Sequence, residues 1–107
     1  MNFCYVITLT PNINEAKSIA HHLVKSRLAA CVNIIPALTS VYEWEGEVCE
    51  ESECMLLIKT KSALFNEVRD GILEKHSYEL PAIVSIPLEQ GFEPFLDWIK
   101  DQTQADK

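Results

Sequence analysis

Glycine is scarce in this sequence of 107 residues, with only Gly46, Gly71 and Gly91 present. A loop that cradles a phosphate, or a dinucleotide-binding turn, requires several glycines in a short segment, so both motifs are excluded. No apolar run approaches the roughly 20 residues of a membrane-spanning helix. The start, MNFCYVITLT, has neither the basic segment nor the small-residue cleavage site of a signal peptide. We therefore expect a soluble, cytoplasmic protein without a membrane partner.

Basic residues are outnumbered, with 9 Lys and Arg against 16 Asp and Glu and a net charge of −7 at pH 7. A field of this sign repels phosphate backbones, so nucleic acid is not an expected partner. The acidic residues concentrate in residues 43–53, EWEGEVCEESE, which contain six Glu and no base. Two interpretations stay open for this segment. It is either a solvated hairpin tip that discourages edge pairing or a loose attractor of divalent cations.

Common metal-binding and catalytic motifs are also missing, because the sequence contains no CxxC pair and no HExxH. Three of the four cysteines lie in apolar segments, where Cys commonly serves as a small core residue. In a cytoplasmic protein these thiols are expected to stay reduced. Cys31 lies in an apolar strand, where a thiol has low reactivity, so it is a poor candidate for a nucleophile. We predict that the protein is not an enzyme.

The first half of the chain predicts a strand, a helix and a long hairpin. Residues 3–10 are rich in β-branched and aromatic residues and end at a proline, and apolar residues then recur at helical spacing over 12–27. From residue 28 to residue 60 the chain is apolar and β-prone on both sides of Gly46, which we expect at the hairpin tip. Pro36 has no N–H for a β-ladder, which predicts a bulge or a free edge there.

The second half predicts a helix that Ser62 caps, a short buried strand over 82–88 and a terminal helix that ends near residue 102. Residues 103–107 are expected to be frayed. The order β-α-β-β-α-β plus a terminal helix defines an α+β fold, the ferredoxin-like split βαβ arrangement, with a long central hairpin. A chain of this length fits one domain, residues 1–107.

The predicted sheet has two apolar faces, although its two crossover helices cover only one of them. In residues 3–10 and 54–58, apolar side chains occupy both alternating sets of positions. The distal hairpin, with Tyr42 and Trp44, extends beyond a four-stranded sheet, so another surface must bury these aromatic side chains. Either the terminal helix folds back over these aromatics, or subunits associate through sheet faces and hairpin edges, which we favour.

Five short motifs follow one another along the chain: LAACVNI (28–34), SVYEWEGEV (40–48), LLIKT (56–60), HSYELP (76–81) and Trp98. With these motifs the sequence resembles the CutA divalent-cation tolerance family over about 100 residues. The resemblance implies a homotrimer of ferredoxin-like subunits, related in architecture to the PII signalling proteins, and an association with Cu²⁺ or other divalent metals. The chain departs from the family at Ser77, where the family usually has proline. It also has Thr8 and Lys75 in places where some members carry a thiol and a second histidine.

The segment KHSYELP, residues 75–81, carries an imidazole, a phenol and a carboxylate between the second helix and the last strand. It is either a capped turn or one wall of a cleft between subunits. The candidate cleft residues are Tyr42, Trp44, Lys59 and Tyr78. The candidate metal ligands are His76, Glu79 and Cys31, since imidazole and thiolate suit copper.

Three functions follow from this reading. The favoured function is a trimeric, non-catalytic protein of divalent metal, copper-type, binding and metal-ion tolerance. The alternative is a PII-like module that senses a small molecule in a cleft between subunits. A third hypothesis is a scaffold that presents its surfaces to another protein. No organic cofactor is expected.

Overall fold

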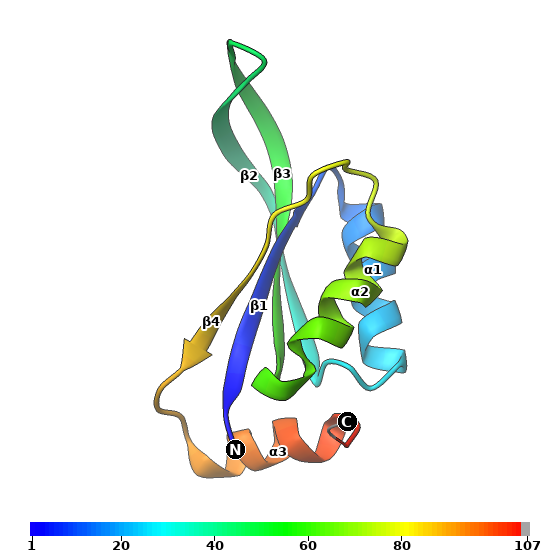
Figure 1. Cartoon of the computed structure of the whole chain (residues 1–107), viewed down its shortest axis with the longest axis vertical. Helices are drawn as coiled ribbons and strands as arrows, with labels where there is room; N and C mark the ends of the chain where they lie inside the picture. Colours follow the sequence, from blue (N-terminus) through cyan, green and yellow to red (C-terminus); the bar gives the residue numbers. More distant parts are fainter. Residues whose placement is uncertain (106–107) are drawn as a thin grey trace.

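The computed structural model describes residues 1–105, which form a four-stranded antiparallel sheet with two helices packed on one of its faces (Figure 1). The strands lie in the order β2-β3-β1-β4, which is the ferredoxin-like arrangement that the sequence predicts. In chain order the elements are β1 (Phe3–Thr10), α1 (Ile13–Lys25), β2 (Cys31–Trp44), β3 (Glu47–Lys61), the 3₁₀ segment η1 (Ser62–Leu64), α2 (Phe65–Lys75), β4 (Ile83–Leu88) and α3 (Glu93–Gln102).

The hydrophobic core lies between the sheet and the helices α1 and α2. Val6 of β1 and Leu56 and Ile58 of β3 are fully buried on the helix-facing side of the sheet. The two helices approach each other closely at Gly71, where an added Cβ would lie 2.9 Å from the Leu23 Cδ2 atom. A larger residue at this position would therefore require the Leu23 side chain to shift.

The hairpin of β2 and β3 extends well beyond the rest of the sheet (Figure 1). Glu45 and Gly46 have φ angles of 50° and 81°, so they form the two-residue turn with positive φ that matches the twist of paired strands. The register shifts between Ile35 and Leu38, and Ala37 has a φ of 61°. The bulge predicted from Pro36 is therefore present.

The helices α1 and α2 begin differently. The Asn12 side chain accepts a hydrogen bond of 2.8 Å from the Glu15 backbone N–H, so Asn12 caps α1. Ser62 does not cap α2. It instead opens the 3₁₀ segment η1, and α2 begins at Phe65 without a side-chain cap.

The terminal helix α3 lies at the end of the sheet opposite the hairpin tip (Figure 1). It therefore does not cover Tyr42 and Trp44, and the alternative in which it folds back over them is wrong. The chain beyond α3 is also more ordered than expected, because the Gln104 N–H bonds to the Arg27 carbonyl at 2.8 Å and Thr103 is buried. Residues 106 and 107 lie outside the described residues, so fraying there stays a prediction.

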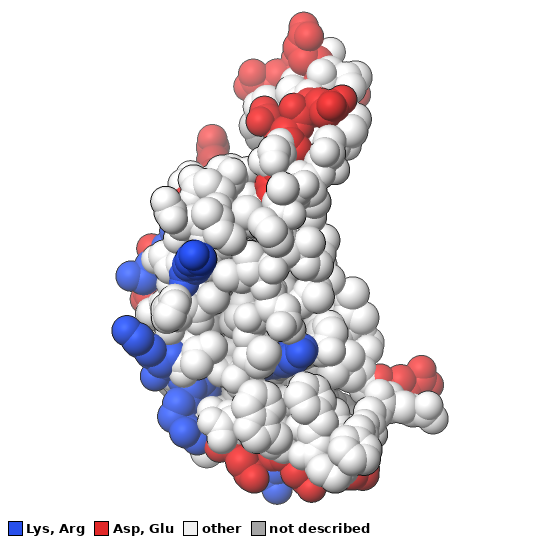
Figure 2. Space-filling view, turned by 180° about the vertical axis from the view of Figure 1, so that it is seen from behind, with Lys and Arg blue, Asp and Glu red and all other residues white. Residues whose placement is uncertain are grey.

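The sheet face away from α1 and α2, which we call the open face, is apolar as predicted. Tyr5, Ile7 and Leu57 point to it and are only partly buried, and Val84 and Ile86 of β4 are exposed. Seen from behind, the molecule has a broad area with few charged side chains below an acidic hairpin tip (Figure 2). Among residues 1–105, no helix is long and apolar enough to cross a lipid bilayer.

Candidate functional site

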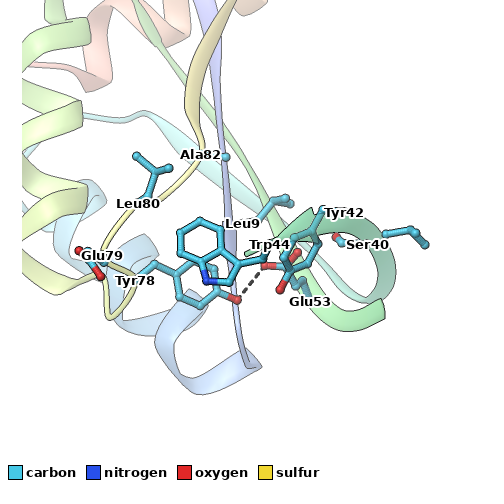
Figure 3. A pocket seen from close by; sticks show the side chains of 10 residues that line it. Leu9, Ser40, Tyr42, Trp44, Glu53, Tyr78, Glu79, Leu80 and Ala82 are labelled. Atoms are coloured by element: carbon cyan, nitrogen blue, oxygen red, sulfur yellow. Dashed lines mark hydrogen bonds between the residues drawn. The ribbon is translucent and has the colours of Figure 1, made fainter. Parts of the chain in front are cut away.

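A cavity of about 450 Å³ lies between the hairpin and the loop that joins α2 to β4 (Figure 3). This loop passes over the end of β1 and brings residues 78–82 opposite the distal part of β2 (Figure 1). We call this site the hairpin cavity. It is lined by Leu9, Ser40, Val41, Tyr42, Trp44, Glu53, Tyr78, Glu79, Leu80 and Ala82.

Glu53 and Tyr78 join the two walls of the hairpin cavity. The Tyr78 hydroxyl donates a hydrogen bond of 2.7 Å to Glu53 Oε2, and Glu53 is only 7% exposed. Burial raises the pKa of Tyr78, and the hydrogen bond to Glu53 and the negative charge of that carboxylate raise it further. Tyr78 therefore stays protonated and serves as a fixed donor to the carboxylate.

His76 holds the loop against the end of β1. Its side chain is fully buried, and its Nε2 lies 2.7 Å from the Leu9 carbonyl oxygen. Its Nδ1 accepts a hydrogen bond of 3.1 Å from the Tyr78 backbone N–H. Because a carbonyl only accepts, Nε2 is the donor in the contact with Leu9. The imidazole thus connects the sheet to the residue whose phenol enters the hairpin cavity.

Glu15 of α1 supports the same loop. Its Oε2 atom accepts hydrogen bonds from the Ser77 N–H at 3.0 Å and from the Ser77 hydroxyl at 3.1 Å. The same oxygen lies 3.4 Å from His76 Nδ1. A proline at position 77 has neither donor, so this chain replaces the fixed φ of a proline with two hydrogen bonds to a carboxylate.

The three predicted metal ligands are not brought together. His76 is buried with both ring nitrogens engaged, whereas Glu79 is exposed and its carboxylate points away from Tyr42 and Trp44 (Figure 3). Cys31 pairs with Lys59 at the far end of the sheet, because β2 runs antiparallel to β3 and reaches the hairpin cavity only after the bulge. Within residues 1–105 no group of three or more His, Cys, Asp and Glu side chains is placed to hold a metal ion.

Three of the four residues predicted for a cleft between subunits, Tyr42, Trp44 and Tyr78, line the hairpin cavity within one chain, and the cleft between subunits stays a prediction. Lys59 does not line this cavity. It lies six positions along β3 from Glu53, about 20 Å away at the usual rise of a strand. Its Nζ atom sits over the Tyr5 ring at 5.7 Å and the Phe95 ring at 5.3 Å, at the α3 end of the open face.

Two residues of the site were missed from the sequence, Glu53 and Glu15. Glu53 was included in the acidic hairpin tip, yet it is buried while Glu50 and Glu51 are exposed. Alternation puts Glu53 on the same strand face as Met55 and Leu57, which is the open face, so it did not predict the burial of Glu53. For Glu15, sequence likewise offered no signal, because its partner Ser77 is 62 residues away.

The hairpin cavity combines apolar walls with a few polar groups. Its lining, all within the described residues, presents aromatic rings, hydroxyls and two carboxylates, but no thiol, imidazole or amine. Concave sites with apolar walls and a few placed polar groups are typical of small-ligand binding. The fold and the site therefore define a ferredoxin-like α+β protein with a binding cavity beside its hairpin.

The comparison with known proteins gives the family. Residues 4–102 match the family described as CutA1 divalent ion tolerance protein. The divalent-cation tolerance protein CutA of Thermus thermophilus is 43% identical over 98 residues, which cover 92% of this chain and 95% of that protein. The chain belongs to the CutA1 divalent ion tolerance family.

Other relatives agree with this assignment. The human protein CutA is 44% identical over 95 residues, or 89% of this chain, but this chain spans only 53% of the human protein's length. Among solved structures, CutA1 of Ehrlichia chaffeensis superposes with a TM-score of 0.92 at 34% identity, covering 97% of each chain. The ferredoxin-like fold is therefore shared across the family.

Proposed function

We propose that the chain is a homotrimeric, non-catalytic protein that binds divalent metal ions, copper among them, in metal-ion tolerance. Membership of the CutA1 divalent ion tolerance family over residues 4–102 carries this proposal. The acidic net charge of −7 also favours cations over anions.

Association into a trimer would cover the open face. Val84 and Ile86 lie exposed on β4, which is an edge strand, and β2 forms the opposite edge. Apolar faces and free edges of this kind are the usual sites of subunit association. Multi-angle light scattering at micromolar concentration tests the proposal. We expect a particle of three times the 12.1 kDa of one chain, and a stable monomer would contradict it.

The proposed metal site draws ligands from more than one copy, since the described part of one chain lacks a group of three ligands. Cys31 is the leading candidate because its thiol is free, partly exposed and located at the sheet edge on the open face. Glu79 is the second candidate because its carboxylate is exposed. Thiolate is a ligand that copper and zinc prefer, and carboxylates complete many such sites.

Titration of Cu(II) and Zn(II) into the reduced protein, in competition with a chelator of known affinity and without oxygen, tests this site. We expect submicromolar binding that Cys31→Ser weakens by about tenfold or more, as loss of one ligand would do. Cys49→Ser is the matched control, because Cys49 is also free and partly exposed but lies on the distal hairpin. Binding no tighter than that of the buffer would overturn the metal proposal.

A second function is favoured by the hairpin cavity itself: a PII-like module that senses a small molecule. Its volume of about 450 Å³ lies within the range of small-ligand sites, and Tyr42, Trp44 and Tyr78 provide its aromatic walls. A thermal-shift screen of nucleotides, organic anions and organic cations tests it, because a ligand that binds only the folded state raises the unfolding midpoint. A flat screen would contradict this function and leave the metal proposal standing.

The cytoplasm is the proposed compartment. All four cysteines are free, and Cys31 and Cys49 are partly exposed. Free thiols of this kind persist where the surroundings are reducing. Fractionation of cells that express the native gene would test the proposal, and recovery of the protein outside the cytoplasmic fraction would contradict it.

A further inference from the structure

We propose that the hairpin cavity binds a small organic cation, a primary ammonium group carried on an apolar body. The proposal rests on the second function above and names the chemical class of its ligand. Three features of the cavity lead to it: a buried carboxylate, a wall of aromatic rings and the absence of any basic side chain from the lining.

The buried carboxylate is Glu53. It accepts one hydrogen bond, from the Tyr78 hydroxyl, and it forms no ion pair with any of residues 1–105. A carboxylate has about four acceptor positions on its two oxygens, so one neutral donor leaves most of them free. Buried charges are normally paired, and no Lys, Arg or His lines this cavity. An ammonium group of a ligand would provide both the missing charge and further N–H donors.

The aromatic wall is formed by Tyr42, Trp44 and Tyr78, whose side chains lie close to Glu53 (Figure 3). Aromatic faces attract cations, and tryptophan does so most strongly. Trp44 is 49% exposed in the single chain and lines the cavity, so its ring is accessible to a ligand there. A cation placed beside Glu53 would meet these rings and cover part of Trp44.

The rest of the lining suits an apolar body. Leu9, Leu80 and Ala82 line the same cavity, and Leu80 is exposed in the absence of a ligand. A hydrated metal ion gains nothing from such a surface. Glu53 is moreover the one carboxylate turned toward the rings, since Glu79 points away (Figure 3). The cavity therefore fits an organic ammonium better than a bare metal ion.

Other ligand classes fit less well. An organic anion would meet the Glu53 carboxylate and a chain of net charge −7. A neutral ligand would leave the buried charge without a counter-ion. The Coulomb interaction that attracts an ammonium group repels an anion and contributes nothing for a neutral ligand, and it is stronger in a partly buried site than in water.

The experiment compares three probes of nearly equal size by isothermal titration calorimetry on the full chain in its assembled state. The probes are 2-phenylethylammonium, neutral 2-phenylethanol and anionic 3-phenylpropionate. We expect the cation to bind at least about tenfold more tightly than the neutral probe, the difference that one charge-assisted hydrogen bond supplies. Equal binding of the cation and the neutral probe would overturn the proposal.

Two variants test whether Glu53 causes the preference for the cation over the neutral probe. Glu53→Gln keeps the shape of the side chain and should remove most of the tenfold preference for the cation. Glu50→Gln is the matched control, because it makes the same change of charge on an exposed residue of the same strand, outside the cavity lining. Loss of the preference in both variants, or in neither, would overturn the assignment to Glu53.

The outcomes separate the ligand class from the function. If 3-phenylpropionate binds and the ammonium probe does not, the proposed ligand class is wrong while the hairpin cavity remains a binding site. If none of the three probes binds and the thermal-shift screen is also flat, the small-molecule function fails together with this inference. A Trp44→Leu variant adds a further criterion, since it should weaken the binding of the cation more than the binding of the neutral probe.

Discussion

The Tyr78 hydroxyl donates a hydrogen bond of 2.7 Å to Glu53 Oε2, and so connects the loop after α2 to the hairpin strand β3. The two residues are 25 positions apart in the chain. Behind this contact, His76 holds the Tyr78 backbone and Glu15 holds Ser77. The wall of the hairpin cavity is thus set by three side-chain contacts that reach from α1 to β3. Each contact predicts a measurable effect.

Tyr78→Phe should lower the free energy of unfolding by about 1.5 to 3 kcal/mol, because it leaves the buried Glu53 carboxylate without its donor. Chemical denaturation at fixed protein concentration measures the change. Tyr42→Phe is the control, since the Tyr42 side chain is exposed and should change stability by less than about 0.5 kcal/mol. Equal effects of the two variants would show that the hydrogen bond to Glu53 has no special role.

The pH dependence of stability should contain a contribution from Tyr78. Its pKa in the folded protein is raised above the ordinary value of 10.0, so the neutral form is favoured by folding. The stabilisation is therefore complete below pH 10 and is lost as the pH rises toward the folded-state pKa. The stability difference between the native protein and Tyr78→Phe should be constant up to about pH 9 and shrink over the interval from about pH 10 to about pH 12. A difference that stays constant over this interval would contradict the assignment.

Ser77→Ala should cost about 1 kcal/mol, because it removes the hydroxyl donor to Glu15 while the backbone N–H remains. Glu15→Ala should cost more, since it removes the acceptor of both hydrogen bonds. In a double-mutant cycle the two changes should be non-additive, as expected for residues in direct contact. Additive effects would mean that Ser77 and Glu15 stabilise the loop independently.

His76→Ala should lower stability by about 2 to 5 kcal/mol, because it opens a cavity and removes two buried hydrogen-bond partners. The copper affinity of His76→Ala, measured at a temperature where this variant is folded, should fall far less than the copper affinity of Cys31→Ser. If copper affinity falls while stability does not, His76 is a direct ligand, as first inferred from the sequence. Thermal unfolding followed by circular dichroism provides the stability measurement.

Ile86→Glu should disrupt the assembly, because it places a charge on the open face at the edge strand β4. Leu73→Glu is the matched control, as Leu73 is also 50% exposed but lies on α2, on the other side of the sheet. Light scattering should give a smaller particle for the first variant only. An unchanged mass for Ile86→Glu would exclude this part of the open face from the interface.

Most of the secondary structure was predictable because it depends on short-range patterns. The helical spacing of apolar residues predicted α1 and α3. The residues around Gly46 predicted the turn, and Pro36 predicted the bulge. Ser62 was misread, because a residue that commonly caps a helix also fits a 3₁₀ turn, and its neighbours in space decide between them. The two apolar sheet faces were predicted because alternation along a strand directly gives the side of each residue.

The site was predictable only in part. Tyr42, Trp44 and Tyr78 were found because aromatic residues in a hairpin and a loop are conspicuous in a small protein. Lys59 was grouped with these aromatics, and Cys31 with His76 and Glu79, because sequence gives the face of a strand but not the distance along it between two elements. That distance depends on the pairing register, which arises from the whole sheet.

The sequence by itself determined the order of the elements, the apolar character of both sheet faces and the family to which the chain belongs, because periodicity and motif order are local properties of a chain. Only the tertiary structure decided that Glu53 is buried against Tyr78, that His76 is engaged through both nitrogens, and that Cys31 lies far from both. Except for the contact of His76 with the Tyr78 backbone, these are relationships between residues tens of positions apart. The packing of the sheet and the loop sets them, and no short segment contains them.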